Sequence, residues 1–166
     1  MFPVLMEYLA GQAANVAERW MGEAARSAES ALCLRDKCGA VVVSGGVVVG
    51  RGYNAPPLDD LSQQLCAREI PPPPKQKVDR TCCVHAEWRA ILDCLQRSPE
   101  KIFGASIYFT RVDAEGTILR SGKPYCTVCS RLALDVGLSE FVLWHDEGLC
   151  SYTTSEYNLL SYGLEP

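Results

Sequence analysis

A histidine, a glutamate and two cysteines are the residues of this chain whose types and spacing could carry out chemistry. His85 and Glu87 stand two positions apart in the stretch TCCVHAEWRAIL, and Cys126 and Cys129 stand three apart in KPYCTVCSRLALDVG. One imidazole and two thiolates suit a tetrahedral Zn²⁺ ion and leave its fourth position open, as in catalytic rather than structural zinc sites. We therefore predict one catalytic zinc ion held by His85, Cys126 and Cys129.

Glu87 acquires a role from this prediction. It precedes Ala90 by three residues and Ile91 by four, so in a helix it would share a face with side chains that favour burial. A buried carboxylate is costly unless something at that place requires it. Zinc lowers the pKa of a bound water towards neutrality. We expect Glu87 to accept the proton of that water and to pass it on as a general acid and base.

Plainer interpretations of the same residues stay open at this point. His85 alone would be taken as a structural histidine, and Glu87 alone as a surface charge favoured by the helix dipole. The C-x-x-C spacing of Cys126 and Cys129 also occurs in redox pairs. A redox pair leaves His85 and Glu87 without a role, so zinc ligation is the preferred interpretation.

Hydrophobic periodicity predicts the elements that must position these groups. The pattern indicates helices over about 4–32, 84–96, 126–136 and 153–162, strands over 105–112 and 140–144, and a β-hairpin over 39–54. The hairpin would turn at Gly45-Gly46, and its valine-rich strands suggest burial on both faces. His85 and the two cysteines would then lie at helix N-termini, where free backbone N–H groups favour thiolates. Alternating strands and helices in the second half indicate an α/β layer fold.

The length of 166 residues predicts a single domain spanning residues 1–166. Residues 55–80 interrupt the regular pattern, because they include Pro56-Pro57 and the proline run 71–74, followed by Lys75, Lys77 and Arg80. A loop of this length is usually a lid or a binding loop. We expect an active-site lid here, with a partner-docking segment as the alternative.

Composition and charge restrict the class of protein. The chain is 48% apolar and 22% charged, which is typical of globular proteins, and its net charge of −4 lacks the strongly basic footprint of nucleic-acid binders. No stretch approaches the roughly 18 apolar residues of a membrane span, and the first residues carry no positive leader. Nine cysteines, an odd count, argue against a full disulfide framework. We expect a cytoplasmic protein in a reducing environment, without membrane or nucleic-acid partners.

The two motifs resemble the H-x-E … P-C-x-x-C signature of the cytidine/deoxycytidylate deaminase superfamily. Here the signature reads His85-Ala86-Glu87 and Cys126-Thr127-Val128-Cys129. The stretches CLRDKCGAVVV and GRGYNAPP are similar to the deoxycytidylate-deaminase branch, and the likeness covers about residues 20–163. The resemblance implies a three-layer α/β/α sandwich with a mixed sheet, in which zinc lies between two helix N-termini.

The resemblance also implies hydrolytic deamination of a nucleobase-containing small molecule. The first expectation is a cytosine nucleotide such as dCMP, converted to the uracil form with release of ammonia. Purine-base, tRNA-adenosine and pterin- or riboflavin-pathway deaminases share the metal motif and stay as alternatives. An inactive deaminase-like binding module with structural zinc is the alternative from another class.

Substrate contacts and assembly follow from the same resemblance. By position, Asn54 would hydrogen-bond the base, the backbone near Ala86 would lie beside it, and Tyr125 could stack on it. The family's proline normally adjoins the first cysteine, whereas here Tyr125 stands between Pro124 and Cys126. Relatives are commonly oligomeric, so a homo-oligomer is expected.

Three cysteines in and next to the lid raise the question of a second metal ion. Some relatives carry a structural zinc in this region. His145 is the only other histidine, so Cys66, Cys82 and Cys83 would have to supply an all-cysteine or mixed site. Spare cysteines are usually small apolar fillers, and we expect one zinc ion rather than two.

Overall fold

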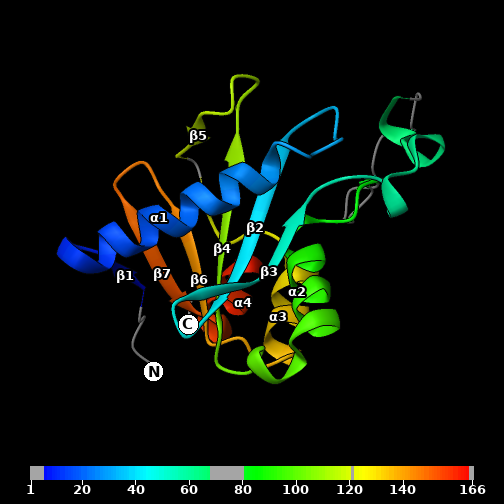
Figure 1. Cartoon of the computed structure of the whole chain (residues 1–166). Helices are drawn as coiled ribbons and strands as arrows, with labels where there is room; N and C mark the ends of the chain where they lie inside the picture. The colour runs from blue at the N-terminus through cyan, green and yellow to red at the C-terminus, as the bar shows by residue number, and fades with distance from the viewer. Residues whose placement is uncertain (1–5, 68–80, 121, 165–166) are drawn as a thin grey trace.

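A mixed β-sheet of seven strands forms the middle layer of the protein (Figure 1). The computed structural model describes residues 6–67, 81–120 and 122–164. The strand order is β1-β7-β6-β4-β2-β3, with β5 paired to β4. Of the named strand pairs, β4 and β6 are parallel and the others antiparallel. The strands are β1 (Glu7–Tyr8), β2 (Lys37–Ser44), β3 (Val47–Tyr53), β4 (Ser106–Val112), β5 (Ile118–Leu119), β6 (Glu140–Trp144) and β7 (Leu149–Thr153).

Helices cover both faces of this sheet. The helices are α1 (Gly11–Ala28), α2 (Ala86–Arg97), α3 (Thr127–Asp135) and α4 (Thr154–Ser161). Helix α1 crosses one face, while α2, α3 and α4 lie on the other (Figure 1). The predicted three-layer α/β/α sandwich with a mixed sheet is therefore confirmed.

The valine run of β2 shows how the sequence produces two cores. Val41 and Val43 pack in the cluster formed with α1, whereas Ala40 and Val42 belong to the cluster under α2, α3 and α4. Successive side chains of a strand point to opposite faces, so a strand between two helical layers must be apolar at every position. Burial on both faces is confirmed for β2, while Val47 at the start of β3 is exposed.

Two glycines of β3 allow α2 to lie against the sheet. A Cβ atom at Gly50 would stand 2.2 Å from the carbonyl oxygen of Ala90, and one at Gly52 would stand 2.0 Å from that of Ala86. No side chain fits at such distances, so glycine is required for this close approach. The contact fixes the first turn of α2, which begins directly after His85.

The start of the first helix and two strands of the sheet differ from the sequence expectation. The first helix begins at Gly11, which has φ +56°, and not near residue 4. Upstream, Glu7 and Tyr8 form the short edge strand β1 against β7. Neither strand was predicted: β1 has only two residues, and β7 is buried on both faces and lacks alternation.

The predicted lid, residues 55–80, is described only up to residue 67. Residues 57–67 form three single 3₁₀ turns, Pro57–Asp59, Leu61–Gln63 and Leu65–Ala67. The proline run 71–74 and the cations Lys75, Lys77 and Arg80 lie outside the described residues. In the described part of the chain, no helix is long and apolar enough to cross a membrane.

Candidate active site

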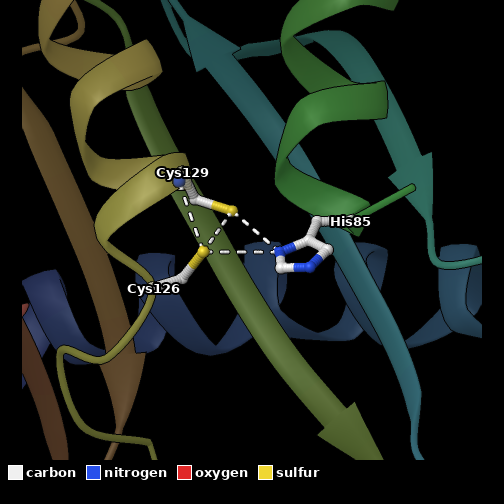
Figure 2. A group of neighbouring side chains, drawn as sticks. All are labelled: His85, Cys126 and Cys129. Carbon is white, nitrogen blue, oxygen red and sulfur yellow. Dashed lines mark hydrogen bonds between the residues drawn. The ribbon is translucent and has the colours of Figure 1, made fainter. Parts of the chain in front are cut away.

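Two helix N-termini meet on the face of the sheet that α2, α3 and α4 cover. His85 is the N-cap residue of α2, and Cys126 is the N-cap residue of α3. The Cys126 thiol accepts the backbone N–H of Cys129 at 3.3 Å, which caps α3 in the way a serine or aspartate usually would. Figure 2 shows the imidazole reaching from one helix start towards both sulfurs on the other. The predicted convergence of two helix starts is thus observed.

The three potential metal ligands lie within hydrogen-bonding distance of one another. His85 Nδ1 is 3.1 Å from Cys129 Sγ and 3.4 Å from Cys126 Sγ, and the two sulfurs are 3.0 Å apart (Figure 2). Among the described residues, no other three His, Cys, Asp or Glu ligand atoms all lie within 4.8 Å of one another. We call these three residues the ligand group.

The chemistry of the ligand group fits Zn²⁺. The hydrogen bond between the two thiols lowers the pKa of Cys126 to about 4, against the opposing effect of burial. The same hydrogen bond and burial raise the pKa of Cys129 well above its usual range. Without a cation, only one of the two adjacent sulfurs can carry charge. One imidazole and two sulfurs without a carboxylate form a donor set that Zn²⁺ prefers.

Glu87 lies beside the ligand group without joining it. Its side chain is 4% exposed, on the first turn of α2. Burial raises its pKa to about 7, against the opposing effect of the neighbouring His85. A carboxyl group with a pKa near neutrality can hold or release a proton under physiological conditions.

A cavity of about 510 Å³ is lined by His85, Glu87 and Cys126, while Cys129 lies buried behind them. The three predicted substrate contacts, Asn54, Ala86 and Tyr125, all line it. The Asn54 side chain is already engaged, because its Oδ1 accepts the backbone N–H of Cys38 at 2.8 Å and its Nδ2 donates to the Asp36 carbonyl at 2.7 Å. The structure therefore brings together every residue that the sequence singled out for the site.

Several lining residues were not anticipated from the sequence. Phe109 lines the cavity from β4, and Tyr157 from α4. Arg35, Arg111 and Lys123 add positive charge to the lining. These five residues are scattered over 123 positions with no common motif, so only the fold shows that they share one cavity.

Four further cysteines lie near the lid. The Cys66 backbone N–H donates to Cys82 Sγ at 3.4 Å, and burial and the neighbouring Cys33 raise the pKa of the Cys83 thiol. We call Cys33, Cys66, Cys82 and Cys83 the lid group. No three of its sulfurs form a compact set like the ligand group. All nine cysteines of the protein are free thiols in the structure.

Comparisons with known proteins agree with this geometry. The sequence model of the cytidine and deoxycytidylate deaminase zinc-binding region matches residues 14–144. The deoxycytidylate deaminase of Mycobacterium phage D29 is 33% identical over 131 residues, covering 75% of this chain and 91% of that protein.

Solved structures share the fold at lower sequence identity. The dCMP deaminase of cyanophage S-TIM5 in its apo form superimposes with a TM-score of 0.51 at 21% identity, over 76% of this chain and 80% of that one. Another structure of that enzyme is a complex with dCMP and dUMP. The cytidine deaminase of Burkholderia pseudomallei gives a TM-score of 0.56 at 17% identity, over 84% of this chain and 94% of that one. Together, the motif-bearing segments, the fold and the 33% identical relative show that the chain belongs to the cytidine and deoxycytidylate deaminase family of zinc-binding hydrolases, which act on C–N bonds.

Proposed function

We propose that this protein is a zinc-dependent deaminase of a cytosine nucleotide of the dCMP type. The observation that carries the proposal is the placement of a buried glutamate with a raised pKa next to a histidine and two cysteines, in the wall of one cavity that His85, Glu87 and Cys126 line. The deoxycytidylate deaminase relative supports the nucleotide as substrate class. The products would be the uracil nucleotide and ammonia.

Three residues would hold one catalytic zinc ion: His85, Cys126 and Cys129. When bound, Zn²⁺ lowers the pKa of a coordinated water towards neutrality and so supplies a nucleophile. Glu87 acts as the proton carrier of the site. Its carboxylate would accept one proton from the attacking water and deliver it to the ring nitrogen next to the amino-bearing carbon. It would then take the second proton from the hydroxyl added to that carbon and deliver it to the amine, which leaves as ammonia.

The remaining lining residues would orient the nucleotide. Asn54 retains hydrogen-bonding capacity towards the base, because each of its two side-chain polar atoms makes one of the two bonds it can form. The backbone at Ala86 would lie beside the base, and the Tyr125 ring could stack on it. Arg35, Arg111 and Lys123 place positive charge on the cavity wall, where a 5′-phosphate would be attracted.

The setting of the enzyme is part of the same proposal. Residues 1–166 would act as one domain, with 55–80 as a lid over the cavity. The protein would be a homo-oligomer in a reducing, cytoplasmic environment, with no nucleic-acid or membrane partner. The acidic net charge of −4 supports a small-molecule substrate over a nucleic acid.

The test measures ammonia release from dCMP, CMP, cytidine, guanine and adenosine. We expect activity on cytosine nucleotides and a much lower kcat/KM for cytidine, because the nucleoside lacks the phosphate. Turnover of guanine or adenosine alone would overturn the substrate assignment. No turnover of any nucleobase compound by zinc-loaded protein would favour the inactive binding module.

Glu87→Gln separates the catalytic role from a structural one. The variant should lose roughly 10²- to 10⁴-fold in kcat, the range for a general acid–base group, and should keep one zinc ion per chain. Glu100→Gln is the matched control, because Glu100 is exposed in the 3₁₀ turn after α2. Loss of zinc from Glu87→Gln would instead make Glu87 part of the metal site.

A further inference from the structure

The imidazole of His85 presents its two nitrogens to two different parts of the protein. Nδ1 faces the sulfurs of Cys129 and Cys126, at 3.1 Å and 3.4 Å (Figure 2). Nε2 lies 3.1 Å from the hydroxyl oxygen of Thr81. A neutral imidazole carries a proton on one nitrogen and a lone pair on the other, and only the nitrogen with the lone pair can bind a metal ion. The position of the ring proton therefore decides which side of the ring can serve as a ligand.

The hydroxyl of Thr81 determines where the ring proton of His85 lies. This hydroxyl donates to the backbone carbonyl of Cys83 at 3.4 Å, and a carbonyl oxygen can only accept. A hydroxyl has a single proton, so with that proton directed at Cys83 it can only accept from Nε2. The Nε2–H of His85 therefore points at Thr81, and the lone pair of Nδ1 points towards the two sulfurs.

Thr81 and His85 belong to a short segment that is fixed by its contacts with the rest of the fold. Val84 lies between them, and its backbone N–H donates to the carbonyl of Ala55 at 2.8 Å, while its carbonyl accepts the Ala55 N–H at 3.3 Å. His85 is the N-cap residue of α2, and its ring lies next to that of Trp88, with centroids 6.0 Å apart. These contacts place the backbone and the ring, and the Thr81 hydroxyl adds a directional bond at the nitrogen far from the sulfurs.

We propose that Thr81 is a positioning residue, whose hydroxyl accepts the Nε2–H of His85 and so directs the lone pair of Nδ1 to the side of the two sulfurs. The inference rests on the proposed zinc site and adds a residue that lies four positions before the H-x-E motif. Histidine ligands of metal ions usually donate their second ring N–H to a neighbouring acceptor. Removal of such an acceptor typically lowers metal affinity or activity by about 10- to 100-fold.

Thr81→Val tests the inference, because valine keeps the branched shape of threonine but has no hydroxyl. We expect this variant to lower zinc affinity by about 10- to 100-fold in competition with a chelator. Thr81→Ser keeps the hydroxyl and should bind zinc nearly as tightly as the wild type. Thr117→Val is the matched control, because Thr117 is also an exposed threonine but lies in the connection between β4 and β5. It should leave zinc affinity at the wild-type value.

Proton NMR of the protein at saturating zinc gives a second readout, which does not depend on affinity. The Nε2–H of His85 should give a low-field signal that exchanges slowly with water, because it is hydrogen-bonded. Thr81→Val should move this signal upfield and accelerate its exchange, whereas Thr81→Ser should retain it. The chain has two histidines, so a His145→Gln variant identifies which signal belongs to His85.

The inference is overturned if Thr81→Val binds zinc as tightly as the wild type, or if its His85 ring signal is unchanged. It is also overturned if Thr81→Ser loses as much affinity as Thr81→Val, since the loss would then not depend on the hydroxyl. Both readouts are taken without substrate, so they report on Thr81 even if cytosine nucleotides prove not to be substrates. Wild-type protein that binds no zinc would instead overturn the proposed function, and this inference with it.

Discussion

Two groups of cysteines border the same cavity, and they are built differently. The ligand group places Cys126 and Cys129 on one helix start, opposite the imidazole at another. The lid group takes Cys66 from the 3₁₀ turn Leu65–Ala67 and Cys33, Cys82 and Cys83 from segments outside the helices and strands. Only the ligand group has all its donor atoms within 4.8 Å of one another in the described part of the chain.

The difference lies in what holds each thiol. Cys126 and Cys129 are joined by a backbone-to-thiol bond within the first turn of α3, so their separation is set by helix geometry. In the lid group, the corresponding bond joins Cys66 to Cys82, which are 16 residues apart and belong to segments without a shared element. Several cysteines close together are therefore not enough for a preformed metal site. The helices and strands must also fix the positions of the thiols before the ion binds.

Replacing one cysteine in each group should give the largest difference in zinc content and activity between two variants. Cys129→Ser removes a buried ligand and should abolish stoichiometric zinc, with at least about a 10³-fold loss of kcat/KM, since a catalytic metal supplies several kcal/mol. Cys82→Ser is the matched control and should keep one zinc ion and near-wild-type activity. Metal analysis and ammonia release on both variants provide the measurement.

Two other outcomes would contradict the proposed difference between the ligand group and the lid group. If Cys82→Ser lost one of two zinc ions per wild-type chain, the lid group would hold a structural metal after all. If Cys129→Ser kept full zinc content and activity, the ligand group would not be the metal site.

Substitution of Gly52 tests whether the close packing of α2 on β3 positions the ligand group. Gly52→Ala would place a Cβ 2.0 Å from the Ala86 carbonyl and 2.4 Å from the Ala90 nitrogen, so the helix must shift away from β3. Such overpacking typically costs about 1–3 kcal/mol of unfolding free energy. Because His85 caps this helix, zinc affinity and activity should fall as well.

Gly22→Ala is the control for Gly52→Ala. Gly22 lies inside α1, and a Cβ there would meet no heavy atom within 4 Å. Alanine should stabilise this helix by about 0.5–1 kcal/mol and leave zinc binding unchanged. Denaturant unfolding and chelator competition distinguish the two substitutions. A Gly52→Ala variant with intact zinc affinity would show that the ligand group tolerates a displaced helix.

Local signals predicted much of the fold and the centre of the site. Gly45 and Gly46 have φ of +56° and +74°, as a primed hairpin turn requires, and the family prediction from the two motifs is confirmed. These features depend on residues close together in the sequence. The roles of His85 and Glu87 stay predictions until the experiments above are done.

The rest depended on contacts between distant parts of the chain. Tyr157 looks like one apolar position of an ordinary helix, and only its stacking on Phe141 and its position on the cavity wall reveal its place. The sequence did not predict β1, because its two residues form an edge strand only by pairing with β7. Long-range pairing leaves no periodic signal in so short a segment.

Substitution of Asp59, which holds the start of the predicted lid, should have the smallest effect on stability and activity. Asp59 Oδ1 is 2.9 Å from Arg89 Nη1 of α2, and Asp59 Oδ2 accepts the Tyr53 hydroxyl at 2.6 Å. Leu58 and Asp59 both have positive φ, +56° and +59°, so these contacts hold a strained turn in place. The Asp59 side chain is 41% exposed, which limits the value of its ion pair to about 1 kcal/mol or less.

Asp59→Asn should therefore lower the free energy of unfolding by less than about 1 kcal/mol. Zinc content and kcat should stay at wild-type values, because the ligand group is held by α2, α3 and the sheet. KM should rise by no more than about fivefold, since a loosened lid segment weakens substrate binding before it affects chemistry. Asp60→Asn serves as the control, because asparagine can still accept the Ser62 backbone N–H that Asp60 accepts at 2.9 Å. Loss of zinc from Asp59→Asn but not from Asp60→Asn would mean that the contact between Asp59 and Arg89 of α2 helps to position the ligand group. The ligand group and the lid group would then belong to one structural unit.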